Sequence, residues 1–175
     1  WGIVRAIADG LEWSYGWQAL AAQRLRFILD FAYSTGLRAS ELVGLTLRSI
    51  TTDGNDDHWL QFVGKGSKPG KVALPPLARS ALDRYLLQRD LPVTRTQWNL
   101  TTPLIGSLEK SSSTNITATR LLNVIKRFFS LAADEMTNEH PTLAEKLQQA
   151  TTHWLRHTHA THALAMGAEL ITVRD

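Results

Sequence analysis

Residues 151–164 read TTHWLRHTHATHAL, and this stretch organises the rest of the chain. It holds four of the six histidines, among them His153 and His157, together with Arg156. Leucines and alanines recur through it at helical spacing, which predicts a helix with one buried side. A helix that only fills a core has no need of an arginine and a histidine beside Leu155. The alternative is a solvated helix start with capping threonines.

A second stretch, residues 35–42, reads TGLRASEL and follows a long apolar stripe of helical period that begins at Trp17. Gly36 stands where a left-handed residue closes a helix, and a short second helix is expected directly afterwards. Arg38 therefore lies at a junction between two helices, with Glu41 within reach to orient it. The alternative is a surface ion pair on a helix start, which contributes under about 1 kcal/mol.

A third stretch, residues 64–68, reads GKGSK and separates two segments of alternating polarity, residues 58–63 and 71–74. This pattern predicts two strands joined by a glycine-rich hairpin tip. The tip carries Lys65 and Lys68, so a basic loop is expected there. The alternative is a solvated turn, which is the usual environment of a hairpin lysine.

The remaining elements complete a mainly helical α+β domain. Residues 47–50 can add a third strand, so a small antiparallel three-stranded sheet is expected. Helices are expected after Pro75-Pro76, from Thr117 to about residue 133, and after Pro141. The second of these helices carries a modest basic face made by Arg120, Lys126 and Arg127.

Composition narrows the class of protein without deciding the function. The 175 residues are 43% apolar and 20% charged, which is ordinary for a folded domain. The chain has no cysteine, which excludes disulfides and Cys-based zinc sites and fits a cytoplasmic protein. No apolar run reaches the roughly 20 residues that cross a bilayer, and no signal peptide is recognised, so no membrane partner is expected. The net charge of +3 permits a nucleic-acid partner but does not argue for one.

The basic residues of the three stretches together suggest a phosphodiester as the target. The guanidinium groups of Arg38 and Arg156 are suited to binding two phosphate oxygens at once. In phosphoryl transfer the protein mainly positions the phosphate and stabilises charge. A histidine such as His153 can stabilise that charge or move a proton, and Lys65 on a flexible tip can protonate a leaving oxygen.

A metal site is a rival interpretation of the histidines. His153 and His157 are four residues apart, which places two imidazoles on one helix face. However, the residue after His153 is Trp154 rather than a glutamate, and no cysteine or nearby carboxylate completes a ligand set. No metal is therefore expected.

The three stretches resemble three motifs of the tyrosine recombinase (phage integrase) family, in the family's order. Residues 35–42 match its T-G-L-R-x-S-E-L box, residues 64–68 its G-K-G-x-K hairpin, and residues 153–162 its H-x-L-R-H-T/S-x-A-T-H box. The resemblance covers about residues 17–175. It implies the integrase-type catalytic fold and a site-specific recombinase that cuts and rejoins DNA through a 3′-phosphotyrosyl intermediate.

The resemblance also implies roles for particular residues. Arg38 and Arg156 would bind the scissile phosphate, and Lys65 would act as general acid for the leaving 5′ hydroxyl. His153 would stabilise the transition state or assist proton transfer, with Glu41 as a supporting carboxylate behind Arg38. His159, by contrast, is interpreted as a helix residue without chemistry. Further DNA contacts are expected from the basic hairpin and the basic helix, namely Lys68, Lys71, Arg120, Lys126 and Arg127.

Two active-site positions of the family pattern would follow residue 175, namely a His or Trp beyond Arg156 and then the nucleophilic tyrosine. Tyr15, Tyr33 and Tyr85 do not lie where that tyrosine belongs. Residues 1–175 are therefore expected to be one catalytic-domain fragment, with residues 1–16 as a lead-in segment or linker. The N-terminal DNA-binding domain and the C-terminal tyrosine segment would lie outside it, and the piece alone is expected to form no covalent DNA link.

The resemblance implies double-stranded DNA as partner and no cofactor. The full-length protein would form a homo-tetramer on DNA, whereas this piece alone would be a monomer. Two alternatives stay open. One is a type IB topoisomerase-like enzyme, and the other is a non-catalytic DNA-binding module of the same fold.

Overall fold

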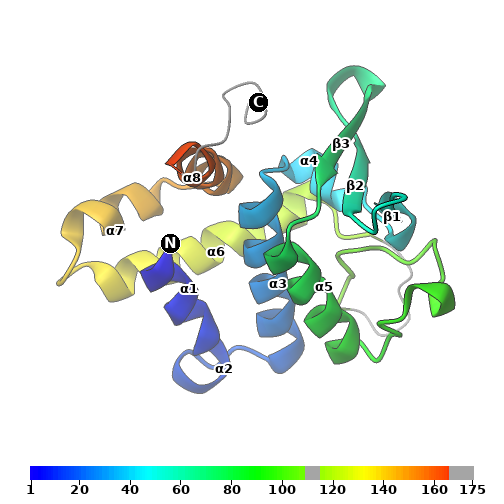
Figure 1. Ribbon diagram of the computed structural model, residues 1–175. Coiled ribbons are helices and arrows are strands. Elements are labelled where there is room, and N and C mark those ends of the chain that lie inside the picture. Colours follow the sequence, from blue (N-terminus) through cyan, green and yellow to red (C-terminus); the bar gives the residue numbers. More distant parts are fainter. Residues whose placement is uncertain (109–114, 166–175) are drawn as a thin grey trace.

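The computed structural model describes residues 1–108 and 115–165 (Figure 1). Most of the domain is helical and a small sheet lies at one side of it, in agreement with the predicted α+β class. In chain order the elements are α1 (Gly2–Asp9), α2 (Leu11–Ser14), α3 (Ala19–Thr35), α4 (Ala39–Val43), η1 (Leu47–Ser49), β1 (Ile50–Thr52), β2 (His58–Val63), η2 (Lys65–Ser67), β3 (Pro69–Ala73), α5 (Pro76–Gln88), η3 (Arg95–Gln97), α6 (Ala118–Met136), α7 (Pro141–Gln148) and α8 (Thr152–Ala165).

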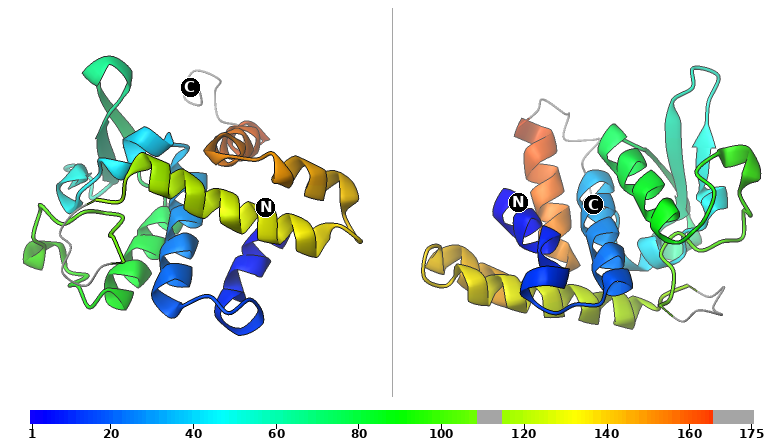
Figure 2. Two further views of the ribbon diagram at one scale, coloured as in Figure 1. Left: turned by 180° about the vertical axis from the view of Figure 1, so that it is seen from behind. Right: turned by 90° about the horizontal axis from the view of Figure 1, so that it is seen from below.

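Helix α3 is the centre of the fold. It lies between α5 on one side and α1 and α8 on the other, with α6 running across behind it (Figure 2). Ten of its 17 residues are buried, because it contacts neighbours on several sides rather than along one stripe. Its end falls at Gly36, which adopts φ 69° and donates its N–H to the carbonyl of Ala32, as the sequence predicts.

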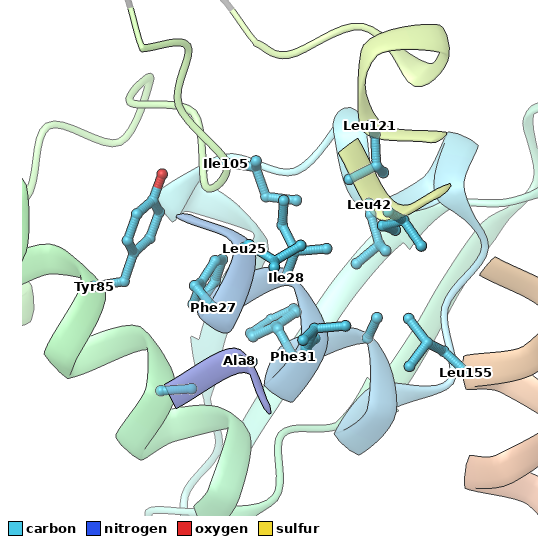
Figure 3. Close-up of a cluster of buried hydrophobic side chains, with 14 of the residues drawn as sticks. Ala8, Leu25, Phe27, Ile28, Phe31, Leu42, Tyr85, Ile105, Leu121 and Leu155 are labelled. Carbon is cyan, nitrogen blue, oxygen red and sulfur yellow. The ribbon is translucent and has the colours of Figure 1, made fainter. Parts of the chain in front are cut away.

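The hydrophobic core is built around this helix (Figure 3). Phe27 stacks on Tyr85 of α5 with ring centroids 4.5 Å apart. Phe31 of α3 and Leu155 of α8 are both fully buried. Leu155 therefore anchors α8 to the core. The expectation that α8 has one buried apolar side therefore holds at Leu155.

The three strands form an antiparallel sheet in the order β1-β2-β3. Leu60 of β2 pairs with Ile50 on one side and Val72 on the other, and both Leu60 and Ile50 are fully buried. The third strand was expected at residues 47–50, but residues 47–49 form a short 3₁₀ helix instead. The Thr46 N–H donates to the Ser49 hydroxyl, and the Ser49 N–H donates to the Thr46 carbonyl. These two bonds close the turn, so the strand begins only at Ile50.

The remaining helices begin where their sequence signals predict. Pro76 occupies the first turn of α5, and Pro141 that of α7. The Thr117 side chain accepts a hydrogen bond from the Arg120 N–H at 3.1 Å and so caps α6. A threonine in this position satisfies one of the free N–H groups of the first helical turn.

Residues 2–14 form two helices that pack on α3. Val4, Ala8 and Leu11 are fully buried. The Arg5 guanidinium bonds the Asp30 carboxylate at 2.7 and 3.0 Å, and that of Arg26 bonds Glu12 at 2.6 and 2.8 Å. This segment therefore contributes to the same core as the rest of the domain.

Within the parts of the chain that the structure describes, none of the helices combines the length and apolarity needed to cross a bilayer.

Candidate functional site

A cleft of about 870 Å³ lies where the three sequence stretches meet. Its walls come from the last turn of α3, the start of α4, the β2–β3 hairpin and α8, which all gather at one end of the molecule (Figure 1). The charged side chains that line it are Arg38, Glu41, Lys65, Lys71 and Arg156. Four cations against one carboxylate make the cleft electropositive.

The floor of the cleft is the junction between α3 and α8. Arg156 donates its Nε–H to the carbonyl oxygen of Gly36 at 3.0 Å. The ring of His159, one turn further along α8, bonds through Nδ1 to the carbonyl of Tyr33 at 2.7 Å. Both carbonyls belong to the C-terminal end of α3, where helix carbonyls lack partners within the helix.

Arg38 enters the cleft at the start of α4. It is the N-cap residue of that helix, with extended backbone at φ −74° and ψ 156°. The Glu41 carboxylate accepts a hydrogen bond from the backbone N–H of Arg38 at 2.9 Å. Glu41 thus fixes the backbone that carries the arginine.

The hairpin supplies the opposite wall. Lys71 lies over the ring of Trp59, 4.7 Å from its centroid, and the Trp59 indole N–H donates to Asp53 at 2.9 Å. That hydrogen bond is the main cause of a lowered pKa of the Asp53 carboxyl. Lys65 stands at the tip, in the short 3₁₀ turn of residues 65–67.

Position 70 in the hairpin has no room for a side chain larger than that of glycine. Gly70 is paired with Phe62 across the two strands, and a Cβ at position 70 would overlap the phenyl ring. The ring therefore lies directly on the glycine backbone, and both residues line the cleft.

The predicted site residues do not all reach the cleft. Arg38, Glu41, Lys65, Lys71 and Arg156 line it, but His153 and Lys68 are exposed and are not among the lining residues. The basic residues of α6 also lie outside it, since α6 runs along the other side of the molecule (Figure 2). Of these, Arg127 packs over the ring of Trp17, 4.5 Å from its centroid.

His159 also lines the cleft, beside the predicted site residues. It was interpreted as a helix residue without chemistry, yet its ring forms part of the cleft wall. It lies three residues after Arg156, so both side chains project from one face of α8. That spacing was the available signal.

The structure bears on the choice between a metal site and a phosphate-binding site at the histidines. Among the side chains that the structure describes, in residues 1–108 and 115–161, no group of three or more His, Cys, Asp or Glu lies close enough to hold a metal ion. Cationic donors around a cleft instead suit an anion with several oxygens, such as a phosphate group. The fold and the cleft together define a mainly helical domain whose charged site is suited to binding a phosphodiester.

The chain belongs to the phage integrase family, whose sequence profile matches residues 17–175. It is 33% identical to tyrosine recombinase XerD of Brucella abortus biovar 1 (strain 9-941), over 98% of this chain and 49% of that protein. It is 32% identical to tyrosine recombinase XerC of Staphylococcus haemolyticus (strain JCSC1435), over 87% of this chain and 44% of that protein. The chain thus spans about half the length of the curated relatives it matches.

Solved structures agree on the fold. The XerH site-specific recombinase bound to difH substrate, in a pre-cleavage complex, superposes with a TM-score of 0.65 at 22% identity. The match covers 98% of this chain and 43% of that one. A post-cleavage complex on palindromic difH substrate gives a TM-score of 0.66. The predicted family and fold class are therefore both confirmed.

Proposed function

We propose that this chain is the phosphate-binding catalytic domain of a site-specific recombinase that acts on double-stranded DNA. The observation that carries the proposal is the convergence of Arg38, Lys65 and Arg156 on one cleft. They come from three separate stretches of sequence, in a chain of the phage integrase family. A module that only needed positive charge could place it anywhere on the surface, so this convergence favours catalysis over simple DNA binding.

In the proposed reaction a tyrosine hydroxyl gives up its proton to solvent and attacks the scissile phosphorus. The 5′ oxygen is displaced, which leaves a 3′-phosphotyrosyl bond. Arg38 and Arg156 neutralise the charge that builds on the non-bridging oxygens. Lys65 donates a proton to the departing 5′ oxygen. Rejoining is the reverse of these steps, so bond energy is conserved and neither ATP nor a metal is consumed.

The supporting residues have less direct roles. Glu41 positions Arg38 through its backbone N–H. His153 precedes Arg156 by three residues on α8, and we assign to it charge stabilisation or proton transfer once DNA is bound. Tyr15, Tyr33 and Tyr85 do not line the cleft, so the proposal gives none of them the role of nucleophile.

Further DNA contacts are proposed on the hairpin, where Lys68 and Lys71 would meet backbone phosphates beside the scissile one. The cleft gives no support to the same role for Arg120, Lys126 and Arg127. For the whole protein we propose a homo-tetramer on DNA, in the cytoplasm, with this chain alone a monomer. The topoisomerase alternative is not favoured, since the named relatives are recombinases.

The test is DNA binding by the 175-residue chain across a series of salt concentrations. Arg38→Ala with Arg156→Ala is compared with wild type, using a labelled duplex. A matched control, Arg84→Ala with Lys146→Ala, removes the same charge from exposed positions outside the cleft. The cleft variant should bind more weakly. The negative slope of log affinity against log salt should become shallower by about 1 to 2.

Equal losses in the cleft variant and the control would mean that only overall charge matters, and the proposed site would be wrong. Urea unfolding of each variant separates a loss of binding from a loss of fold.

A further inference from the structure

Two side chains of α8 hold the end of α3 at the edge of the cleft. Arg156 bonds the Gly36 carbonyl at 3.0 Å, and His159 bonds the Tyr33 carbonyl at 2.7 Å. The two donors are one helical turn apart, and so are the two acceptors. The contact is therefore a paired attachment of one helix to the end of another, rather than a single bond.

The ring of His159 also lies against Gly36 itself. A Cβ at position 36 would come within 2.6 Å of Cδ2 and 3.1 Å of Nε2. Gly36 has φ 69°, a conformation that glycine adopts without strain. The glycine thus serves two purposes, because it turns the chain toward Arg38 and leaves room for the imidazole.

This arrangement links the two arginines of the proposed site. Arg38 follows Gly36 by two residues, while Arg156 is bonded to the Gly36 carbonyl. Whatever fixes Gly36 against α8 therefore fixes the spacing between Arg38 and Arg156. His159 contacts both the glycine and the last turn of the helix before it.

We propose that His159 is a positioning residue, which holds the end of α3 against α8 and so sets Arg156 opposite Arg38 for one phosphate. The inference rests on the proposed function for the identity of the bound group. A carbonyl oxygen only accepts hydrogen bonds, so Nδ1 of His159 must carry the proton in this contact. The neutral ring then has its proton on Nδ1 and a lone pair on Nε2, and that tautomer can be measured.

Charged side chains from several elements line the cleft together with His159. They are Arg156 on its own helix, Arg38 and Glu41 on α4, and Lys65 and Lys71 on the hairpin. The imidazole bonds the backbone carbonyl of Tyr33 through Nδ1. The effect of the ring on the site therefore runs through the backbone of α3.

The experiment compares three single variants of the 175-residue chain. His159→Phe keeps a ring but removes the donor, and His159→Asn restores an N–H donor at the position of Nδ1. His157→Phe is the matched control, since His157 is exposed on the same helix. Affinity for a labelled duplex should fall about tenfold in His159→Phe and recover in His159→Asn, with little change in the control.

The combined variant His159→Phe with Arg156→Ala distinguishes positioning from a separate structural role. If His159 acts through Arg156, the combined variant binds about as weakly as Arg156→Ala alone. Losses that multiply would overturn the proposal. So would an Nε2–H tautomer of His159 in nitrogen NMR spectra of the wild-type chain.

Hydrogen exchange measured without DNA tests the role of His159 separately from the proposed function. The Arg156 Nε–H signal should be protected from exchange in wild type and lose that protection in His159→Phe. Unchanged protection would overturn the positioning role, even if DNA binding behaves as proposed. If Arg156→Ala instead leaves DNA affinity unchanged, the proposed function fails, while the Nε–H signal still decides the role of His159.

Discussion

Arg156 and Gly36 are joined by a hydrogen bond from Nε to the carbonyl oxygen at 3.0 Å, across 120 residues of sequence. Gly36 closes α3 in the left-handed conformation, and Arg156 lies on α8. The bond therefore joins the Arg156 side chain to the backbone of the stretch that carries Arg38. The geometry of the cleft depends on the packing of α8 as much as on the charged side chains.

Replacing Gly36 by alanine should be costly for two separate reasons. The left-handed conformation costs alanine about 1 to 2 kcal/mol, and the new methyl group would overlap the His159 ring, adding about 1 to 3 kcal/mol. Gly66→Ala is the control, because Gly66 has φ 72° but open space around it. Urea unfolding should give Gly36→Ala the larger loss of unfolding free energy, and equal losses would exclude the overlap.

The N-terminal helices should contribute strongly to stability through Leu11. Its side chain is fully buried, so Leu11→Ala should lower the free energy of unfolding by about 2 to 5 kcal/mol. Trp13, two residues on, is 85% exposed, and Trp13→Ala should change stability by less than about 0.5 kcal/mol. Thermal and urea unfolding of both variants test this contrast. A small effect of Leu11→Ala would show that α1 and α2 detach without unfolding the rest.

Much of the fold follows from local signals in the sequence. The apolar stripe after Trp17 and the glycine at position 36 predict α3 and its end, and Thr117 predicts the start of α6. These signals act through backbone conformation and capping, which depend on a few neighbouring residues. The hairpin is predicted for the same reason, by alternation on both sides of a glycine-rich tip.

The parts that could not be predicted depend on contacts between distant residues. His159 appears in the sequence as one histidine among four, and only the packing of α8 on Gly36 brings it to the cleft. Arg127 appears as part of a basic face, yet it stacks on Trp17, which lies 110 residues earlier in the sequence. Periodicity indicates which face of a helix is buried, but it does not indicate what that face meets.

The ion pair between Glu12 and Arg26 should make stability depend on pH. Hydrogen bonds from the Arg26 guanidinium are the main cause of a lowered pKa of Glu12. A carboxyl whose pKa is lower in the folded state stabilises the fold above its unfolded pKa of about 4.3, and this is lost as pH falls through the folded pKa. Glu12→Gln should therefore cost about 1 kcal/mol near pH 7 and less near pH 3.

Urea unfolding of wild type and Glu12→Gln at both pH values checks this. A deficit of the same size at both would mean that shape or packing, rather than charge, explains the effect.

The buried Arg24 and the half-buried Arg89 should respond differently to replacement by methionine. Arg24 is 3% exposed, its Nε has no hydrogen-bond partner in the described structure, and its Nη1 lies 3.4 Å from the Gly106 carbonyl. Burial lowers the pKa of both Arg24 and Arg89, so the contrast between them rests on their hydrogen bonds, which are poor at Arg24. Arg89 instead donates from Nη1 to the carbonyls of Pro103 and Leu104, at 2.9 and 3.2 Å.

Removing a poorly compensated buried charge while keeping its apolar stem is often neutral or stabilising, because the cost of desolvating the charge disappears. Arg24→Met should therefore change the free energy of unfolding by less than about 1 kcal/mol, or raise it. Arg89→Met leaves two carbonyls without donors and should lower it by about 2 kcal/mol. Matching losses in urea unfolding would show that Arg24 is as well compensated as Arg89, which would contradict the account of its burial.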